Sequence, residues 1–385
     1  MAEQGPPPPP SDLFEGQAAS ERAARDLHWV EDTVACGDGS GEVSVQYDHI
    51  KHLVCPGTDH ELVLAPGFPE ARDEIHEGEL ICPLDGRRVP IRDCIPRFHE
   101  EGEYVESFGN QWNRFRRTQI DKFNGTTLSR DRFYSGTRWR PEGLQGTRVL
   151  EVGCGAGRFT QILLDAGAVV YAVDYSNAVD ACFENNGPHP KLCVVQSDLY
   201  QMPFRKHSFD YVFCYGVLQH TPDVREAFMS LIPFLKPGGK LAIDVYRKGW
   251  VLEPYKSKYL YRPIAKRMSP DLLFRVIEWY VPKWLPVDTV IKRIPVLGPM
   301  LGMAIPCWNY SYFPLTKQQQ QEWAILDTFD ALASRYDCPQ TLDTVQRWFE
   351  EAGLEEIRVG YGGNGILGNG RASVAGVGET ARQAC

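Results

Sequence analysis

Short runs of apolar residues, each ending at a polar or glycine position, recur through the middle of the chain. They cover residues 149–152, 169–174, 192–196, 209–214 and 240–246. Because these runs are nearly continuous and do not alternate with polar positions, they predict strands that are buried on both faces, as in a parallel sheet. Segments of helical character lie between the runs. The pattern therefore predicts a doubly wound, Rossmann-like α/β sheet.

The end of the chain completes this pattern with a helix and a hairpin. Residues 341–352 place Leu342, Val345 and Phe349 on one helical face, and Gly353 predicts the end of that helix. Residues 354–359 and 365–368 follow as two short strands that pair with each other. With the five runs above, the hairpin predicts a sheet of seven strands.

Changes in composition divide the rest of the chain. A proline tract at residues 6–10 opens a polar stretch, which predicts a disordered tail. The predicted organisation is a disordered tail (1–45), a small β-rich module (46–100), a helical lid or linker (101–144), a core (145–246 and 336–372), a helical cap inserted into the core (247–335) and a loose tail (373–385).

Three glycines follow the first strand, at Gly153, Gly155 and Gly157. Glycine allows a sharp turn and lets a ligand approach the main chain. A dinucleotide site has the spacing Gly-x-Gly-x-x-Gly, but here Arg158 stands where the last glycine would be. Glu151, just before the loop, would repel a pyrophosphate and attract a cationic ligand, directly or through water.

This loop resembles motif I of the class I S-adenosyl-L-methionine-dependent methyltransferases. The resemblance implies that S-adenosyl-L-methionine is the cofactor, that the last strand of the sheet is antiparallel, and that Glu151 and the three glycines contact the cofactor. Asp174 ends the second strand, 19 residues after Gly155, the separation at which an acid reaches ribose hydroxyls. The resemblance further assigns Asp198 and Leu199 to the adenine, and it adds Tyr175, Tyr215 and Gln219 to the cofactor-binding set.

The loop after the fourth strand narrows the class of acceptor. Enzymes that methylate exocyclic amines of bases carry Asn/Asp-Pro-Pro-aromatic here, whereas this chain has Cys-Tyr-Gly-Val at 214–217. The following residues 218–223 and the Leu-Lys-Pro-Gly-Gly turn at 235–239 are similar to the ubiquinone-type small-molecule group. In that fold this loop faces the transferred methyl group, which makes His220 the first candidate for a general base. Tyr246 and, more weakly, Asp244 are the other catalytic candidates.

The N-terminal module resembles a zinc ribbon that has lost its metal. Cys55 and Cys82 each precede proline, but Thr58 and Asp85 stand where the second cysteine of each pair would be. Because structural zinc needs four ligands, we predict no metal. The alternative is a site that His52, His60 and Asp85 complete.

The net charge and the cysteines limit the kinds of partner and the cellular compartment that we expect. The chain has 385 residues, 43% of them hydrophobic, and a net charge of −9, which argues against nucleic acid as a partner. Its eleven cysteines are scattered and no signal peptide or transmembrane run is visible, which predicts a cytoplasmic protein with free thiols. The oligomeric state stays open.

The cap departs from the rest of the chain in charge. Residues 247–293 hold eleven Lys or Arg and four Asp or Glu, and many aromatic residues. This composition predicts a cap that binds an anionic or lipid-linked acceptor, and it raises the hypothesis of a peripheral contact with the inner face of the membrane. The alternative is a cap that packs only on its own domain.

The sequence thus predicts an S-adenosyl-L-methionine-dependent methyltransferase that acts on a small-molecule or a lipid- or sugar-linked acceptor. Two alternatives stay open. One is a subunit that binds the cofactor for regulation and does not catalyse, and the other is an NAD-dependent oxidoreductase.

Overall fold

The computed structural model describes residues 46–66, 75–99, 113–249, 258–294, 297–302 and 305–374. The tails expected at 1–45 and 373–385 lie outside these ranges, except for residues 373 and 374. Residues 100–112 of the expected lid and residues 250–257 of the expected cap also lie outside them.

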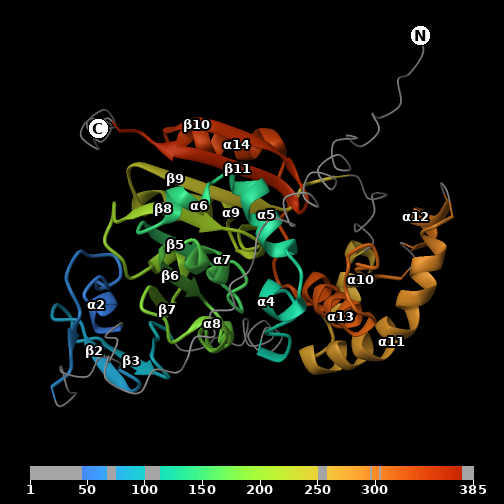
Figure 1. The fold of residues 1–385 in the computed structure, drawn as a ribbon, viewed down its shortest axis with the longest axis horizontal. Coiled ribbons are helices and arrows are strands. Elements are labelled where there is room, and N and C mark those ends of the chain that lie inside the picture. The colour runs from blue at the N-terminus through green and yellow to red at the C-terminus, as the bar shows by residue number, and fades with distance from the viewer. Residues whose placement is uncertain are drawn as a thin grey trace, which may run out of the picture. The chain divides into compact units, whose positions relative to one another are not determined.

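A seven-stranded sheet organises the core, as the apolar runs predict (Figure 1). Its strand order is β10-β11-β9-β8-β5-β6-β7, and β11 is antiparallel to both of its neighbours. The other pairs within the sheet are parallel. The strands are β5 (Arg148–Val152), β6 (Val169–Asp174), β7 (Leu192–Gln196), β8 (Phe209–Cys214), β9 (Leu235–Val245), β10 (Leu354–Gly362) and β11 (Gly365–Ala372).

Alternate residues of the central strands enter two cores, one on each face of the sheet. On one face Leu150 and Tyr171 pack with α9 (Val224–Leu231) and α14 (Leu342–Glu351). On the other face, Val149 and Val170 pack with α5 (Leu128–Thr137), α6 (Pro141–Leu144), α7 (Thr160–Asp165) and α8 (Ala178–Asn186). Burial on both faces explains why the strand sequences are continuous apolar runs.

The N-terminal module is a four-stranded antiparallel sheet that follows α2 (Gln46–Ile50). Its strands are β1 (Val63–Leu64), β2 (Gly78–Ile81), β3 (Arg88–Arg92) and β4 (Ile95–Pro96). The module shares one apolar core with the large sheet, and Leu53 forms a β-bridge to Phe204. The small β-rich sheet is therefore confirmed.

The prediction of free thiols throughout was wrong for two cysteines. Cys55 and Cys82 form a disulfide, with their Cα atoms 5.8 Å apart. Two turns of the module bring them together, a proximity that a separation of 27 residues does not reveal. In the part of the chain that the structure describes, no three His, Cys, Asp or Glu side chains gather as a metal site. Among the candidate ligands, His52 instead packs against Tyr171 of the large sheet.

Between β9 and α14 the described residues form four helices, which make up the cap, and three of these helices share an apolar core of their own (Figure 1). The four helices are α10 (Lys258–Ala265), α11 (Pro270–Ile291), α12 (Leu297–Gly302) and α13 (Lys317–Ala333). Ser269 caps α11 and Pro270 occupies its first turn, while a capping box of Thr316 and Gln319 starts α13. Along α11, buried residues recur every four positions and face α13; they are Leu273, Ile277, Val281 and Leu285.

Two of the basic cap residues are buried, against the expectation that these charges face an acceptor. Lys258 and Arg262 both form ion pairs with Asp337, and their side chains are 7% and 6% exposed. Arg262 also donates to the carbonyl oxygens of Ala331 and Ser334. These two cations therefore hold the cap together. No helix in the described ranges is long and apolar enough to cross a membrane.

Candidate functional site

The glycine loop turns at the carboxyl end of β5 and is packed tightly from outside. Gly153 and Gly157 both have positive φ, at 78° and 82°. A Cβ on Gly153 would lie 2.0 Å from Val217, and one on Gly157 would lie 2.1 Å from Asn186. Glycine is thus required at both positions by the backbone angle and by the neighbouring side chains.

Asp174 lies at the end of β6 and ties the glycine loop to the next turn. Its Oδ2 accepts from the Gly155 amide at 2.9 Å, and its Oδ1 accepts from the amide and hydroxyl of Ser176 at 2.9 and 2.7 Å. A carboxylate has about four acceptor positions, so three bonds leave room for a ligand hydroxyl. The side chain is half-buried at the sheet edge, which suits the ribose contact predicted for it.

Glu151 does not lie open beside the loop but beneath it. The residue is 1% exposed, Oε2 accepts from the Thr160 hydroxyl at 2.6 Å, and Oε1 has no partner in the described structure. Burial raises the pKa of Glu151 to about 8. Glu151, which the sequence suggested as an anion for a cationic ligand, is therefore protonated at neutral pH.

Glu151→Gln should flatten the pH dependence of stability. The folded protein holds the Glu151 proton from its ordinary pKa of 4.5 up to about 8, whereas the unfolded chain releases it near 4.5. The free energy of unfolding should therefore fall as the pH rises through this window, with a slope of up to about 1.4 kcal/mol per pH unit. Glutamine is uncharged, so urea unfolding from pH 5 to 8.5 should lose this component. The exposed Glu142→Gln should leave the slope unchanged.

The loop after β7 carries two more of the predicted cofactor-binding residues. Asp198 accepts from the Tyr200 amide at 2.9 Å and caps a short 3-10 helix that begins at Leu199. The Tyr175 ring stacks on His99, with centroids 4.0 Å apart and an angle of 18° between the rings. Burial raises the pKa of Tyr175, and the charge of Asp198 contributes, so the two side chains lie near each other. His99 was missed in the sequence because it follows the β-rich module, far from any motif.

Unpartnered polar atoms lie at the end of β8. Tyr215 is 5% exposed and Gln219 is fully buried. In the described structure, neither the Tyr215 hydroxyl nor the Gln219 side-chain amide has a hydrogen-bond partner. Buried polar groups without partners are costly, and a polar ligand would satisfy them. Both residues belong to the predicted cofactor set, so the residues present fit a polar cofactor at this edge.

Asp244 is committed to an ion pair, which removes it as a candidate base. It is fully buried and accepts from Arg132 at 2.7 Å and from the Gly216 amide. Arg132 comes from α5, and nothing in its sequence context distinguishes it from the other basic residues of that segment. The pair fixes the turn that follows β8.

The rings of His220 and Tyr246, two of the candidate catalytic residues, pack against each other at the sheet edge. Their rings are 5.4 Å apart at an angle of 85°. Nδ1 of His220 lies 3.1 Å from the Tyr336 carbonyl oxygen, which can only accept, so the neutral ring carries its proton on Nδ1 and leaves Nε2 as the basic nitrogen. Burial raises the pKa of Tyr246 well above its ordinary value, so this phenol stays neutral. Asp330 of α13 lies close enough for the charge of His220 to lower the pKa of that carboxyl, against the larger upward effect of burial.

Polar side chains of the cap lie beside Arg158 of the glycine loop, an arrangement that the sequence did not indicate. Arg158 donates to Gln119 and Ser129 at 2.9 and 2.8 Å and lies over the Trp323 ring. Burial lowers its pKa to about 9. Asp327 of α13 accepts from the hydroxyl of Tyr310, the indole of Trp323 and the Gln119 amide, and burial raises its pKa to about 6. Arg158 thus joins the loop to the cap, where a dinucleotide fold would have glycine.

Comparisons with known proteins locate the family resemblance in the same segment. Residues 150–243 match the family described as "Methyltransferase domain". "Phosphoethanolamine N-methyltransferase 2" of Caenorhabditis elegans is 33% identical over 119 residues, which is 29% of this chain and 27% of that protein. "Ubiquinone biosynthesis O-methyltransferase" of Coxiella burnetii is 32% identical over 132 residues, 34% of this chain and 54% of that protein. The chain thus spans about a quarter to a half of these relatives.

Solved structures resemble the fold distantly. Phosphoethanolamine N-methyltransferase 2 of Haemonchus contortus in complex with S-adenosyl-L-methionine has a TM-score of 0.39 and 18% identity, covering 71% of this chain and 48% of that one. Magnesium protoporphyrin IX methyltransferase of Synechocystis with bound SAH has a TM-score of 0.39 and 17% identity, covering 70% and 97%. The family match over residues 150–243 covers the strands and loops that carry the resemblance to methyltransferases.

Proposed function

We propose that this methyltransferase domain belongs to an S-adenosyl-L-methionine-dependent enzyme that methylates a small-molecule or a lipid- or sugar-linked acceptor. One observation carries the proposal. The segment that matches the methyltransferase family contains the carboxyl ends of β6 and β8, which bear Asp174 and, just beyond β8, the polar atoms of Tyr215 and Gln219 that have no partner in the described structure. Buried polar atoms without partners are costly, and a polar ligand at this edge would satisfy them.

The residues of this edge divide between the parts of the cofactor. Asp174 keeps acceptor capacity for a ribose hydroxyl, and we assign Asp198 and Leu199 to the adenine. Tyr175 offers the outer face of its stacked ring, while the loop glycines expose main chain. Tyr215 and Gln219 offer polar atoms to the amino-acid end. S-adenosyl-L-methionine, when bound, supplies an electrophilic methyl group on a sulfonium.

The protein then has to orient the acceptor and take up its proton. Nε2 of His220 accepts the proton of the attacking hydroxyl or amine, while the Tyr336 carbonyl fixes the ring through Nδ1. The nearby Asp330 stabilises the imidazolium that results. Tyr246 packs edge-on against the imidazole and limits its rotation. Correct orientation and exclusion of water contribute up to roughly 7–11 kcal/mol to such reactions.

The relatives support two acceptor atoms. One matched relative is named as an N-methyltransferase and the other as an O-methyltransferase. A base such as His220 matters most for an oxygen acceptor, because a hydroxyl is a weak nucleophile until its proton is removed. We therefore place O-methylation first and N-methylation second.

Isothermal titration and a transfer assay test the proposal. The protein should bind S-adenosylhomocysteine and not NADH, which would exclude the oxidoreductase alternative. Methyl-labelled S-adenosyl-L-methionine, incubated with the protein and a cell extract, should then label an organic-soluble or small polar product. Binding without any labelled product across extracts would favour the regulatory subunit.

Asp174→Ala should weaken S-adenosylhomocysteine binding by roughly tenfold to a hundredfold, since a charged hydrogen bond to a ribose hydroxyl is lost. Glu184→Ala on α8 removes a surface carboxylate that pairs with Arg116, so it is the matched control and should bind normally. Thermal unfolding of both variants separates loss of the ligand contact from loss of the loop anchor at Gly155. Equal affinity in Asp174→Ala and wild type would remove this residue from the site.

The basic residues of the cap bear on which acceptor the protein binds. The buried pairing of Lys258 and Arg262 removes them from acceptor capture, but the exposed Arg267 and the exposed Lys266, whose ammonium donates to the Arg335 carbonyl, stay on the surface. A peripheral membrane contact of the cap therefore remains a hypothesis that rests on fewer charges than the sequence offered.

A further inference from the structure

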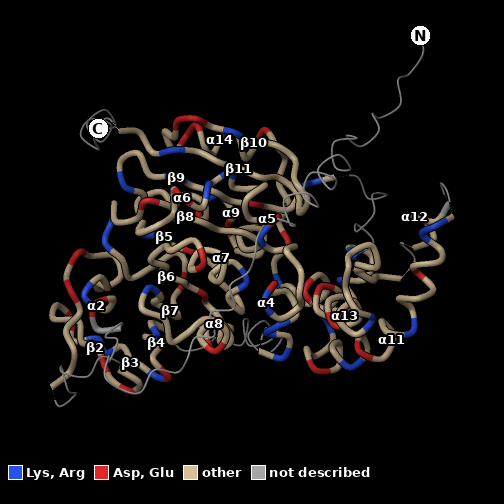
Figure 2. The backbone as a smooth tube through the Cα atoms, in the orientation of Figure 1, with Lys and Arg blue, Asp and Glu red and all other residues tan. Residues whose placement is uncertain are grey.

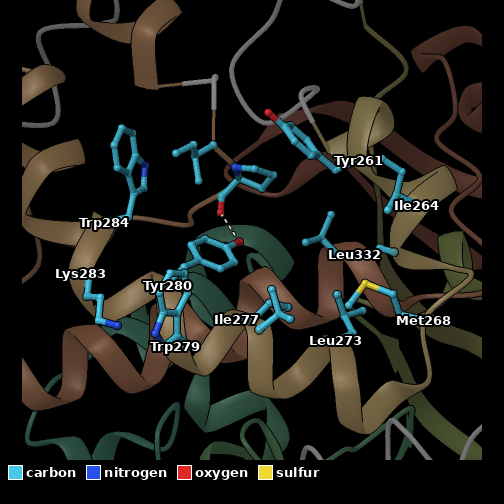
Figure 3. Close-up of a pocket in the computed structure, with 14 residues that line it drawn as sticks. Tyr261, Ile264, Met268, Leu273, Ile277, Trp279, Tyr280, Lys283, Trp284 and Leu332 are labelled. Atoms are coloured by element: carbon cyan, nitrogen blue, oxygen red, sulfur yellow. Dashed lines mark hydrogen bonds between the residues drawn. The ribbon is translucent and has the colours of Figure 1, made fainter.

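We propose that a groove in the cap binds the aliphatic chain of one anionic amphiphile. The groove has a volume of about 390 Å³ and lies between α10, α11 and the segment of Ile305 and Pro306 (Figure 3). Its size falls within the range of small-molecule sites. It lies in the cap, so the inference goes beyond the methyl transfer proposed above and does not depend on it.

The walls are almost entirely apolar and aromatic. Ile264, Val276 and Trp279 line the groove although they are 63%, 40% and 67% exposed, and Leu273 and Ile277 form its floor. Solvent-exposed apolar groups gathered around a hollow are characteristic of a ligand site or an interface. An aliphatic chain would remove these groups from water without needing a polar partner for itself.

One buried polar atom in the wall has no hydrogen-bond partner among the residues that the structure describes. The indole Nε1 of Trp284 is buried and makes no hydrogen bond in the described structure. The neighbouring Tyr280 hydroxyl is already used, since it donates to the Pro306 carbonyl at 2.7 Å (Figure 3). Trp284 therefore has a donor available for one oxygen atom of a ligand.

The charge at the groove favours an anionic ligand. Lys283 is the charged residue among the described residues that line it, and its ammonium lies 4.0 Å from the centre of the Trp279 ring. Acidic and basic positions alternate along α11, and two basic residues, Lys292 and Arg293, follow its end before α12 (Figure 2). The Lys283 ammonium favours a carboxylate or phosphate at the end of an aliphatic chain, and the Trp284 indole offers a donor to an oxygen atom of the ligand.

A peptide fits the groove less well than an aliphatic chain. Each residue of a peptide would bring an N–H and a C=O into the groove, and walls of this composition would leave most of them unpaired. A second copy of this chain would meet the same limit unless it inserted only side chains. The chemistry of the walls thus favours a lipid chain with one oxygen-bearing head.

Competition titration with the full chain tests the proposal. The probe is cis-parinaric acid, a fluorescent fatty acid, displaced by saturated fatty acids of eight to twelve carbons below their micellar concentrations. Each added methylene should strengthen binding by about fourfold until the groove is full. Ile264→Glu places a charge in the groove at an exposed position and should weaken binding at least tenfold. Val290→Glu is the matched control, because Val290 is also 63% exposed but does not line the groove.

Two further variants test the polar contacts. Trp284→Phe keeps an aromatic ring and removes the donor. It should therefore weaken the binding of decanoate and the binding of decanol equally, by about fivefold to tenfold. Lys283→Gln should weaken the binding of decanoate and leave the affinity for decanol unchanged. Circular dichroism of each variant should match the wild type.

Three outcomes would overturn the proposal. One is equal affinity of the fatty acids for Ile264→Glu and Val290→Glu. Another is binding to anionic phospholipid vesicles without binding of monomeric fatty acid, which would make this face a bilayer contact. The third is a concentration-dependent dimer that Ile264→Glu abolishes and fatty acid does not affect, which would make it an interface between copies.

Discussion

Asp337→Ala should lower the free energy of unfolding by about 3–5 kcal/mol, the range for removal of one partner from a buried ion pair. The Asp337 side chain is 2% exposed and lies against Lys258 and Arg262, whose side chains are almost equally buried. It also accepts from the Tyr259 hydroxyl at 3.1 Å. Without the carboxylate, a buried ammonium would lose its counter-ion. Burial already lowers the pKa of Lys258, which shows the cost of keeping it charged there.

Urea unfolding followed by circular dichroism measures this effect. Asp343→Ala is the control, because Asp343 is exposed at the start of α14 and its loss should change stability by less than about 0.5 kcal/mol. Asp337→Asn keeps an oxygen for Tyr259 but no charge, so it should fall between the two. If Asp337→Ala unfolds as Asp343→Ala does, the ion cluster is not what holds the cap.

His220→Gln should lower kcat by roughly a hundredfold to ten-thousandfold, the usual contribution of a general base. Glutamine can still donate to the Tyr336 carbonyl but has no nitrogen that accepts a proton at neutral pH. The affinity for S-adenosylhomocysteine should change by less than threefold, because the imidazole is assigned to the acceptor. The labelled-methyl assay with its identified acceptor measures kcat, and calorimetry measures affinity.

His207→Gln is a matched control for this prediction. His207 precedes β8 and its ring nitrogen also lies within hydrogen-bond distance of a backbone carbonyl, that of Leu235, at 2.9 Å. It stands at the opposite end of the strand from His220, so its replacement should leave kcat within about twofold. A His220→Gln enzyme that keeps a third or more of wild-type kcat would show that no base acts at this position.

The sheet was predictable because its signal is local. Buried parallel strands must be apolar on both faces, so their sequences show continuous runs that a reader of the chain can locate. Gly153 and Gly157 were predictable for the same reason, since a turn with positive φ leaves glycine at fixed positions. The antiparallel direction of β11 came only from the family resemblance, and its position between β9 and β10 was not predicted.

The burial of charges was not predictable. A count of Lys and Arg in the cap cannot show that Lys258 and Arg262 face inward, because Asp337 lies about 75 residues further along the chain. Arg132 and Asp244 are separated by 112 residues, and Glu151 looks like an exposed strand-end acid until Thr160 and the loop cover it. Each of these contacts depends on tertiary packing, which a single sequence does not display.

The short segment 336–340 restricts how this protein can be rebuilt. Its main chain bonds to three residues of the site: the Tyr336 carbonyl to His220, the Cys338 amide to the Gln219 carbonyl, and the Gln340 amide to the Tyr246 carbonyl. Asp337, in the middle of it, binds the cations of α10. Consider a chimera in which the cap comes from another protein and the downstream junction lies before residue 336. In that chimera segment 336–340 would no longer have the α10 cations that pair with Asp337. The exchanged segment should therefore run to residue 340 and include a compatible α10. Otherwise the Tyr336 carbonyl will not hold His220 in its present position.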